Sequence, residues 1–143
     1  ENPNLSLNAG SVHSVSVSSE NAKALKYKEL EPYWLRATAI DKLPQVANSI
    51  PVCVIDSGLD AEHPDLPNST TGYHSTYAGF WNKDAFSHGT HITGIIAAQE
   101  NGVGVKGALS ESTASLHISK LIKTANGESS IIWGSSLIEA IEV

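Results

Sequence analysis

The sequence contains one cysteine and no methionine. The single cysteine, Cys53, excludes a disulfide within the chain and a zinc site built on several thiolates. Without a methionine, Glu1 is not a translated start, so we expect a processed or truncated piece of a longer chain. No apolar stretch approaches the roughly 20 residues of a membrane helix, and no charged-then-apolar signal peptide opens the chain. We therefore expect no membrane partner.

Basic residues are also few. Nine Lys and Arg face 15 Asp and Glu, which gives a formal charge of −6 and no basic run. Because nucleic-acid phosphates require clustered Lys and Arg, we expect no nucleic-acid partner. A hydrophobic content of 41% with 17% charged residues is typical of a globular chain rather than a disordered one.

The first half of the chain changes character at about residue 50. Residues 1–24 are rich in Ser and Asn, and the alternation at residues 12–17 predicts a short edge strand. Residues 35–43 predict a short helix that Pro44 stops. Residues 51–55 form a continuous apolar, β-branched run, which is typical of a buried parallel strand. On such a strand Cys53 is expected to be a buried thiol that packs as a hydrophobe.

The second half alternates loops, helices and a strand. Residues 59–87 are mostly loop because they hold prolines, glycines and many hydroxyl groups. Residues 89–99 are apolar nearly all round, as in a buried helix. A glycine loop at residues 101–107 precedes a second strand at 115–122, and a further helix begins in 129–143. This order predicts an α/β fold with a parallel sheet and crossover connections.

Two features have the residue types that catalysis uses. Asp56 follows the buried strand directly, at the edge of an α/β sheet where ligands and catalytic groups collect. An aspartate that bonds its own backbone in an Asp-Ser-Gly turn is the alternative reading. His88 lies in the first turn of the apolar helix, where the helix dipole disfavours imidazolium and keeps the ring a usable base. His91, one turn later, is expected to be a buried histidine with its hydrogen bonds satisfied.

Together these segments resemble the subtilisin-like serine proteases, the subtilases. The resemblance rests on residues 52–60 (VCVIDSGLD), 63–66 (HPDL) and 88–94 (HGTHITG), with Asp56 and His88 separated by 32 residues. Residues 101–107 and 116–121 resemble the next loop and strand of that family. The resemblance implies the three-layer, parallel-sheet subtilisin-like fold, of which only the N-terminal half is present.

The same resemblance implies serine endopeptidase activity on polypeptides in a secreted protein. Asp56 corresponds to the carboxylate that orients the histidine, and His88 to the general base and acid. The family's nucleophile lies in a Gly-Thr-Ser-Met-Ala-like turn that residues 1–143 do not contain. We therefore assign no serine of this chain as nucleophile, and we expect the fragment to be inactive without the C-terminal half of the domain.

Substrate and propeptide assignments also follow from the resemblance. In the family, the segment after the second strand pairs with the peptide as an added strand, which gives Ile122, Asn126 and Gly127 as substrate-binding candidates. A solvated loop with a glycine turn is the alternative for these residues. Residues 1–36 are interpreted as a propeptide remnant or N-terminal extension, with the protein's own propeptide as a partner, and residues 37–143 as the N-terminal half of the peptidase domain.

A structural Ca²⁺ is the cofactor that the resemblance implies. The expected ligands are the Asp65 carboxylate, the Asn101 side-chain oxygen, and the backbone carbonyls of Gln99, Val103 and Val105. The family takes a further ligand from the mature N-terminus, for which the sequence offers no clear match. An ordinary glycine turn is the alternative.

Two other function classes remain open. One is a metal-dependent hydrolase or metal-binding domain built on His63, Asp65, His88 and His91, residue types that bind zinc, although no HExxH helix supports it. The other is a non-catalytic binding module that keeps the subtilase fold without the serine.

Overall fold

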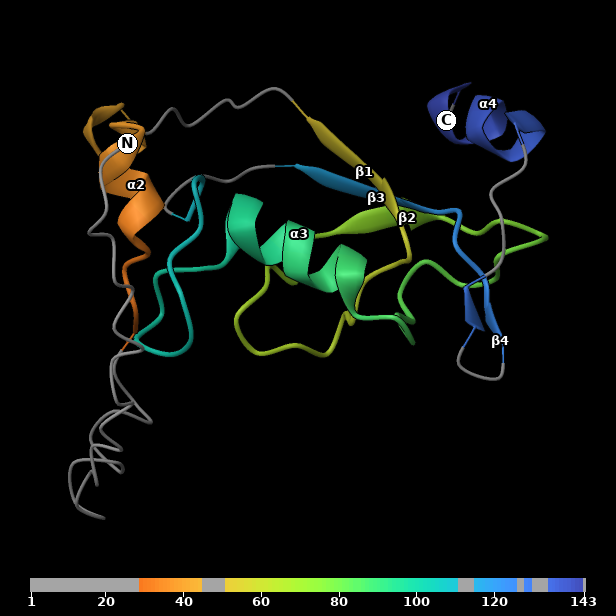
Figure 1. The fold of residues 1–143 in the computed structure, drawn as a ribbon, viewed down its shortest axis with the longest axis horizontal. Helices are drawn as coiled ribbons and strands as arrows, with labels where there is room; N and C mark the ends of the chain where they lie inside the picture. The colour runs from red at the N-terminus through yellow and green to blue at the C-terminus, as the bar shows by residue number, and fades with distance from the viewer. Residues whose placement is uncertain (1–28, 45–50, 111–114, 126–127, 130–133, 143) are drawn as a thin grey trace, which may run out of the picture.

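The computed structural model describes residues 29–44, 51–110, 115–125, 128–129 and 134–142. The predicted edge strand at residues 12–17 lies outside them. The elements, in chain order, are α2 (Tyr33–Ala37), the 3₁₀ helix η1 (Ile40–Lys42), β1 (Val52–Asp56), β2 (Thr71–Tyr73), α3 (His88–Ala97), β3 (Leu116–Lys120), β4 (Thr124–Ala125), β5 (Glu128–Ser129) and α4 (Gly134–Glu142). The fold is α/β, as the sequence predicts (Figure 1).

A three-stranded parallel sheet forms the centre of the fold, with strand order β1-β3-β2. Asp56 at the end of β1 pairs with Lys120 at the end of β3, so the carboxyl ends of both strands meet at one edge of the sheet. Because β1 and β3 run parallel, the chain between them must cross over the sheet, and α3 lies in this crossover. Figure 1 shows α3 lying across one face of the three strands.

The hydrophobic core lies between α3 and the sheet. Its buried members are Val54, Leu59, Leu66, Ala98 and Ile118, and Val52, Trp81, Ile92 and Ile96 pack against them. Side chains alternate between the two faces of a strand, so the residue after Ile118 points away from α3. That residue, Ser119, is fully buried, and its hydroxyl donates a 3.4 Å hydrogen bond to the Ala140 carbonyl of α4. Helices therefore lie on both faces of the sheet, as expected for a three-layer fold.

Two predicted element boundaries are wrong. The helix predicted for residues 35–43 ends at Ala37, because Ala39 takes a left-handed conformation with φ of 58° before η1 begins. The hydroxyl of Thr38 also donates to the Trp34 carbonyl at 2.7 Å, which ties down the end of the helix. Within the predicted loop 59–87, β2 pairs with β3 as an extra strand. Its three residues, with Gly72 at the centre, are too few to show an alternating pattern.

Cys53 and helix α3 are less buried than the sequence predicts. The Cys53 thiol is exposed rather than buried, because β1 is an edge strand among the described residues and Cys53 lies on the face away from α3. Helix α3 is buried on one side only: Gly89, Thr93 and Ala97 are buried, while Ile95 is 41% exposed. None of the helices in the described part of the chain is long and apolar enough to cross a bilayer.

Candidate active site

Asp56 and His88 meet at the carboxyl edge of the sheet. The Nδ1 atom of His88 lies 2.9 Å from both carboxylate oxygens of Asp56. The Asp56 side chain is 13% exposed and the His88 side chain 53%. A carboxylate that faces Nδ1 favours the tautomer with the proton on that nitrogen, which leaves Nε2 as the ring's proton acceptor.

The backbone around Asp56 fixes its carboxylate. The N–H of Ser57 donates to Asp56 Oδ1 at 2.6 Å, and the carbonyl of Asp56 accepts from the N–H of Leu121 at 2.8 Å. The hydrogen bond from the Ser57 N–H is the contact expected if Asp56 were an aspartate that bonds its own backbone in a turn. The structure shows that this contact and the contact with His88 exist together.

The first turn of α3 packs directly on the turn after β1. A Cβ atom added at Gly89 would lie 2.2 Å from the carbonyl oxygen of Gly58 and 3.2 Å from Cβ of Asp56. The N–H of Gly89 donates to the hydroxyl of Ser57 at 2.9 Å. Glycine is therefore required directly after His88, and the close approach brings the His88 ring to the carboxylate.

Asp84 is a residue of this site that the sequence analysis did not identify. Its carboxylate accepts hydrogen bonds from the hydroxyls of Ser57 and Thr90 and from backbone N–H groups at the start of α3. Burial alone raises the pKa of Asp84, but the bonds from Thr90, Ser57 and Ser87 lower it below the ordinary value. The signal that would have found it is an acidic residue just before a helix start, the usual composition of a helix N-terminus.

Lys120 places a buried side chain against the turn that follows β1. It is 6% exposed, and its Nζ donates to the carbonyl of Lys83. Burial lowers the pKa of Lys120, while the nearby Asp84 carboxylate acts in the opposite direction. The site thus combines one half-exposed imidazole with the buried Lys120 and the partly buried carboxylates of Asp56 and Asp84.

The serines beside the dyad have other partners. The Ser57 hydroxyl is 2.8 Å from Asp84 Oδ1 and is buried, so it does not face the His88 ring. Ser87 is the N-cap residue of α3 and has a left-handed backbone with φ of 63°. Among the described residues, the hydrogen bonds of the His88 ring go to Asp56 alone.

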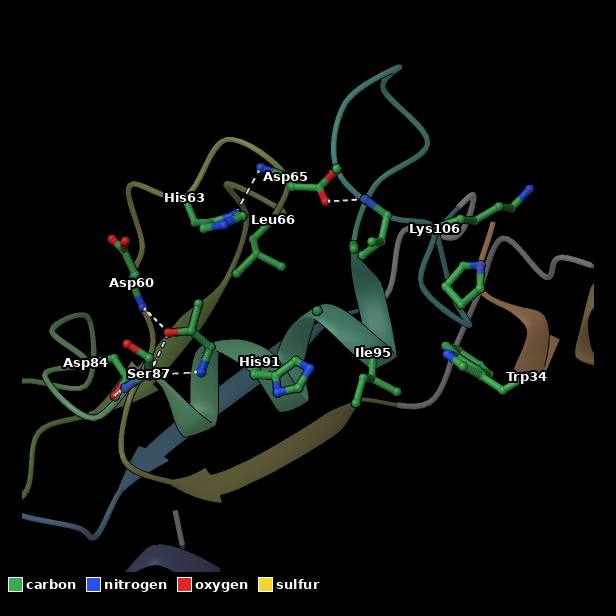
Figure 2. Close-up of a pocket in the computed structure, with 16 residues that line it drawn as sticks. Trp34, Asp60, His63, Asp65, Leu66, Asp84, Ser87, His91, Ile95 and Lys106 are labelled. Carbon is green, nitrogen blue, oxygen red and sulfur yellow. Dashed lines mark hydrogen bonds between the residues drawn. The ribbon is translucent and has the colours of Figure 1, made fainter. Parts of the chain in front are cut away.

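A cavity of about 600 Å³ lies along the outer side of α3 (Figure 2). Trp34, Leu66, His91 and Ile95 contribute to its lining. His91 is exposed, so the prediction that it is a buried, satisfied histidine is wrong. It lies one turn after His88 on the side of α3 that the core does not cover.

The predicted calcium ligands lie around one buried carboxylate. Asp65 is 4% exposed; its Oδ2 accepts the Val105 N–H at 2.9 Å, and its Oδ1 is buried without a hydrogen-bond partner. Gly104, with φ of +69°, leaves room for this carboxylate, because a Cβ atom there would lie 2.1 Å from Oδ2. An orphaned carboxylate oxygen enclosed by a glycine loop fits a hard cation.

Two further oxygens lie at the same loop. The Asn101 side-chain oxygen accepts the Val103 N–H at 3.0 Å, and its amide nitrogen donates to the Pro64 carbonyl at 3.2 Å. Glu29, which the sequence analysis did not identify, accepts the Asn101 N–H at 3.2 Å. Leu30 then pairs with the loop through Val105, so the N-terminal segment reaches the candidate calcium loop.

The remaining candidates are less well placed. Ile122 is partly buried two residues after the end of β3, and its N–H is 3.4 Å from the Asp56 carbonyl. Asn126 and Gly127 lie outside the described residues. The Nδ1 atom of the His63 ring accepts the backbone N–H of Asp65 at 3.3 Å. In the described ranges, no three His, Cys, Asp or Glu side chains are grouped so as to hold a metal ion. The zinc-type cluster considered for the second function class is therefore not assembled.

Comparisons with known proteins agree on one family. Residues 47–142 match the sequence model of the Subtilase family, Peptidase_S8. Subtilisin E of Bacillus subtilis (strain 168) is 34% identical over 132 residues, covering 83% of this chain and 32% of that protein. The major intracellular serine protease of the same strain is 39% identical over 90 residues, covering 59% of this chain and 28% of that protein.

A solved structure gives the same result. A psychrophilic subtilisin-like protease from the Antarctic psychrotroph Pseudoalteromonas sp. AS-11 is 33% identical, with a TM-score of 0.68. The match covers 80% of this chain and 26% of that one. The chain spans about a third of the length of the curated relatives that it matches first.

Proposed function

The chain belongs to the subtilase family of serine proteases, and on that basis we propose that it is the part of a serine endopeptidase that supplies the general base. The observation that carries the proposal is the 2.9 Å contact of His88 Nδ1 with the Asp56 carboxylate at the carboxyl edge of the sheet. The nucleophilic serine is supplied from outside residues 1–143. The substrates are polypeptides.

In this mechanism His88 carries the proton. Its Nε2 accepts the hydroxyl proton of the serine as the oxygen attacks the peptide carbonyl, and later donates it to the leaving amine. The Asp56 carboxylate stabilises the imidazolium that forms in between and holds the ring in the required tautomer. The Ser57 N–H keeps that carboxylate oriented.

The remainder of the catalytic domain is the partner that this half requires. The exposed side of α3 that carries His88 also carries His91 and Ile95, which line the cavity. We infer that the segment with the serine packs along this side, since it must reach Nε2 of His88. The predicted role of residues 1–36 as a propeptide remnant stays a prediction; the proposed boundary after residue 36 falls within α2.

We also propose a structural Ca²⁺ held by Asp65, Asn101 and the carbonyls of Gln99, Val103 and Val105, with Glu29 as an added oxygen donor. The orphaned Asp65 Oδ1 and the glycine loop support it. When bound, the ion would neutralise the buried carboxylate and join the loop to the N-terminal segment. The chemistry at His88 does not involve it.

Secretion is proposed with the activity. It rests on the resemblance of the chain to the subtilases. One relative, in contrast, is named as an intracellular protease. Immunoblotting of the culture medium and of washed cells of the source organism distinguishes the two locations.

The test of the function uses the protein made from the complete gene. We expect casein hydrolysis that a serine-directed phosphonate blocks and that His88→Ala abolishes. A complete protein that binds the phosphonate covalently but hydrolyses nothing would contradict the peptidase proposal. A folded complete protein with no Gly-Thr-Ser turn after Val143 would instead favour the non-catalytic binding module.

A further inference from the structure

The Asp84 carboxylate is saturated with hydrogen bonds that all point toward it. Its Oδ1 accepts from the Ser57 hydroxyl at 2.8 Å, the Ser87 N–H at 2.9 Å and the Phe86 N–H at 3.2 Å. Its Oδ2 accepts from the Thr90 N–H at 2.9 Å and the Thr90 hydroxyl at 2.6 Å. Because every partner is a donor, only a side chain with two hydrogen-bond acceptor atoms, such as a carboxylate, satisfies all of these partners.

This requirement makes asparagine a sharp probe of Asp84. An asparagine has the same shape, but it places an NH₂ group on one side, where that group meets either the Thr90 donors or the Ser87 and Phe86 donors. One set of hydrogen bonds is then lost, and a partly buried N–H is left facing another donor.

Ser57 connects this carboxylate to the catalytic pair. Its hydroxyl donates to Asp84 and accepts the Gly89 N–H at 2.9 Å, so both of its bonds have a defined direction. Its own N–H donates to Asp56 Oδ1 at 2.6 Å. One fully buried serine thus contacts the aspartate of the dyad and the residue that follows the histidine.

The result is a connection between two elements that are distant in the sequence. Asp84 holds the first turn of α3 through Ser87 and Thr90, and it holds the turn after β1 through Ser57. Asp56, the last residue of β1, directly precedes the turn that carries Ser57, and His88 is the first residue of α3. The relative position of the two side chains therefore depends on Asp84.

We propose that Asp84, acting through the Ser57 hydroxyl, is a positioning residue that keeps the Asp56 carboxylate and the His88 imidazole within hydrogen-bond distance of each other during proteolysis. The proposal rests on the proposed function. Asp84 does not touch the His88 ring; it acts on the backbone of the two turns that carry the pair.

The experiment measures the complete protein and four variants: Asp84→Asn, Ser57→Ala, the double variant of these two, and the control Asp60→Asn. Asp60 is an exposed carboxylate near the same helix end, and within the described part of the chain its side chain bonds only the Glu62 N–H, at 3.2 Å. The readouts are kcat, KM and the downfield proton resonance of the hydrogen bond between His88 and Asp56. This resonance requires no turnover.

For Asp84→Asn we expect kcat to fall by roughly 10²-fold, the scale of a 1 Å misplacement, with KM changed less than about twofold. The His88 resonance should broaden or disappear through exchange with water. Ser57→Ala should do the same to a smaller extent. The double variant should be no worse than Asp84→Asn alone, because both changes break one connection. Asp60→Asn should match the wild type.

Normal kcat and an intact resonance in folded Asp84→Asn would overturn the proposal, as would an equal loss in Asp60→Asn. If Asp84→Asn does not fold, Ser57→Ala decides, since it leaves the contacts of Asp84 with Ser87 and Thr90 in place. A wild-type protein without His88-dependent hydrolysis would refute the proposed function itself. That outcome is distinct from an active wild type that tolerates Asp84→Asn.

Discussion

Gly89 lies against the carbonyl oxygen of Gly58 so closely that a Cβ atom at Gly89 would be only 2.2 Å from it. The two glycines belong to different turns, one after β1 and one at the start of α3. Their contact sets how far His88 is from Asp56. The distance between the catalytic candidates is therefore determined by backbone packing as well as by the hydrogen bond between their side chains.

Gly89→Ala should lower both stability and activity. The added methyl group must push the Gly58 carbonyl away, and overpacking of this kind costs about 1–3 kcal/mol. The matched control is Gly134→Ala, because a Cβ atom at Gly134 meets nothing within 4 Å. Urea unfolding and casein hydrolysis of both variants of the complete protein check the prediction, which fails if the two variants behave alike.

Replacing either member of the dyad should affect the chemical step. His88→Ala should lower kcat by roughly 10⁶-fold and Asp56→Asn by roughly 10⁴-fold, with KM nearly unchanged, because both groups act in the transition state. Steady-state kinetics on a peptide anilide measure both constants. His91→Ala should retain far more activity than His88→Ala, because His91 does not contact Asp56. The reverse order would exchange the roles of the two histidines.

Asp84 should contribute to stability in a defined pH range. Its folded-state pKa is lowered from the ordinary 3.8 by hydrogen bonds that outweigh burial. A carboxyl group with a lowered folded pKa stabilises the protein fully above its ordinary pKa, and the contribution is lost as the pH falls through the folded value. The melting-temperature difference between wild type and Asp84→Asn should thus be large at pH 6 and shrink below about pH 4. A difference that grows toward acid pH would contradict this account.

The sequence predicted the sheet and the dyad because each depends on a local pattern. The apolar run before Asp56 and the helix after His88 are visible in single segments, and the order of elements implies a parallel sheet. The resemblance to the subtilases then supplied the pairing of the two residues, which the 2.9 Å contact in the structure matches.

The features that were missed depend on contacts distant in the sequence. Asp84 lies in a loop with no periodicity, and its partner Ser57 is 27 residues away. Glu29 reaches Asn101 across 72 residues. Cys53 and His91 belong to apolar segments, so composition alone suggested burial. Their exposure follows from the edge position of β1 and the uncovered side of α3.

Cys53 should be protected in the complete protein if further strands or helices cover β1. In the present chain its thiol is exposed. We expect an alkylating reagent to modify Cys53 of the native complete protein much more slowly than the same protein unfolded in urea, as followed by mass spectrometry of the Cys53 peptide. Equal rates would show that nothing packs on this strand in the complete protein.

Calcium should raise the melting temperature of the complete protein. A ligand that binds only the folded state stabilises it by mass action, about 2.7 kcal/mol at a concentration 100 times the Kd. The ion would satisfy Asp65 Oδ1, which is buried without a partner, and it would draw on the carbonyls of the glycine loop. Calorimetry in millimolar Ca²⁺ and in chelator measures the shift.

Two substitutions separate the ion from the loop that holds it. Asp65→Asn removes the charge but leaves an oxygen able to accept the Val105 N–H, so the apo protein should melt near the wild type while the calcium shift disappears. Gly104→Ala should lower stability even in chelator, because the methyl group would collide with the Asp65 carboxylate and strain a backbone at φ of +69°. Asp60→Asn, which removes an exposed carboxylate, should keep the full calcium shift. A wild-type protein whose melting is indifferent to Ca²⁺ and to chelator would show that the loop binds no ion.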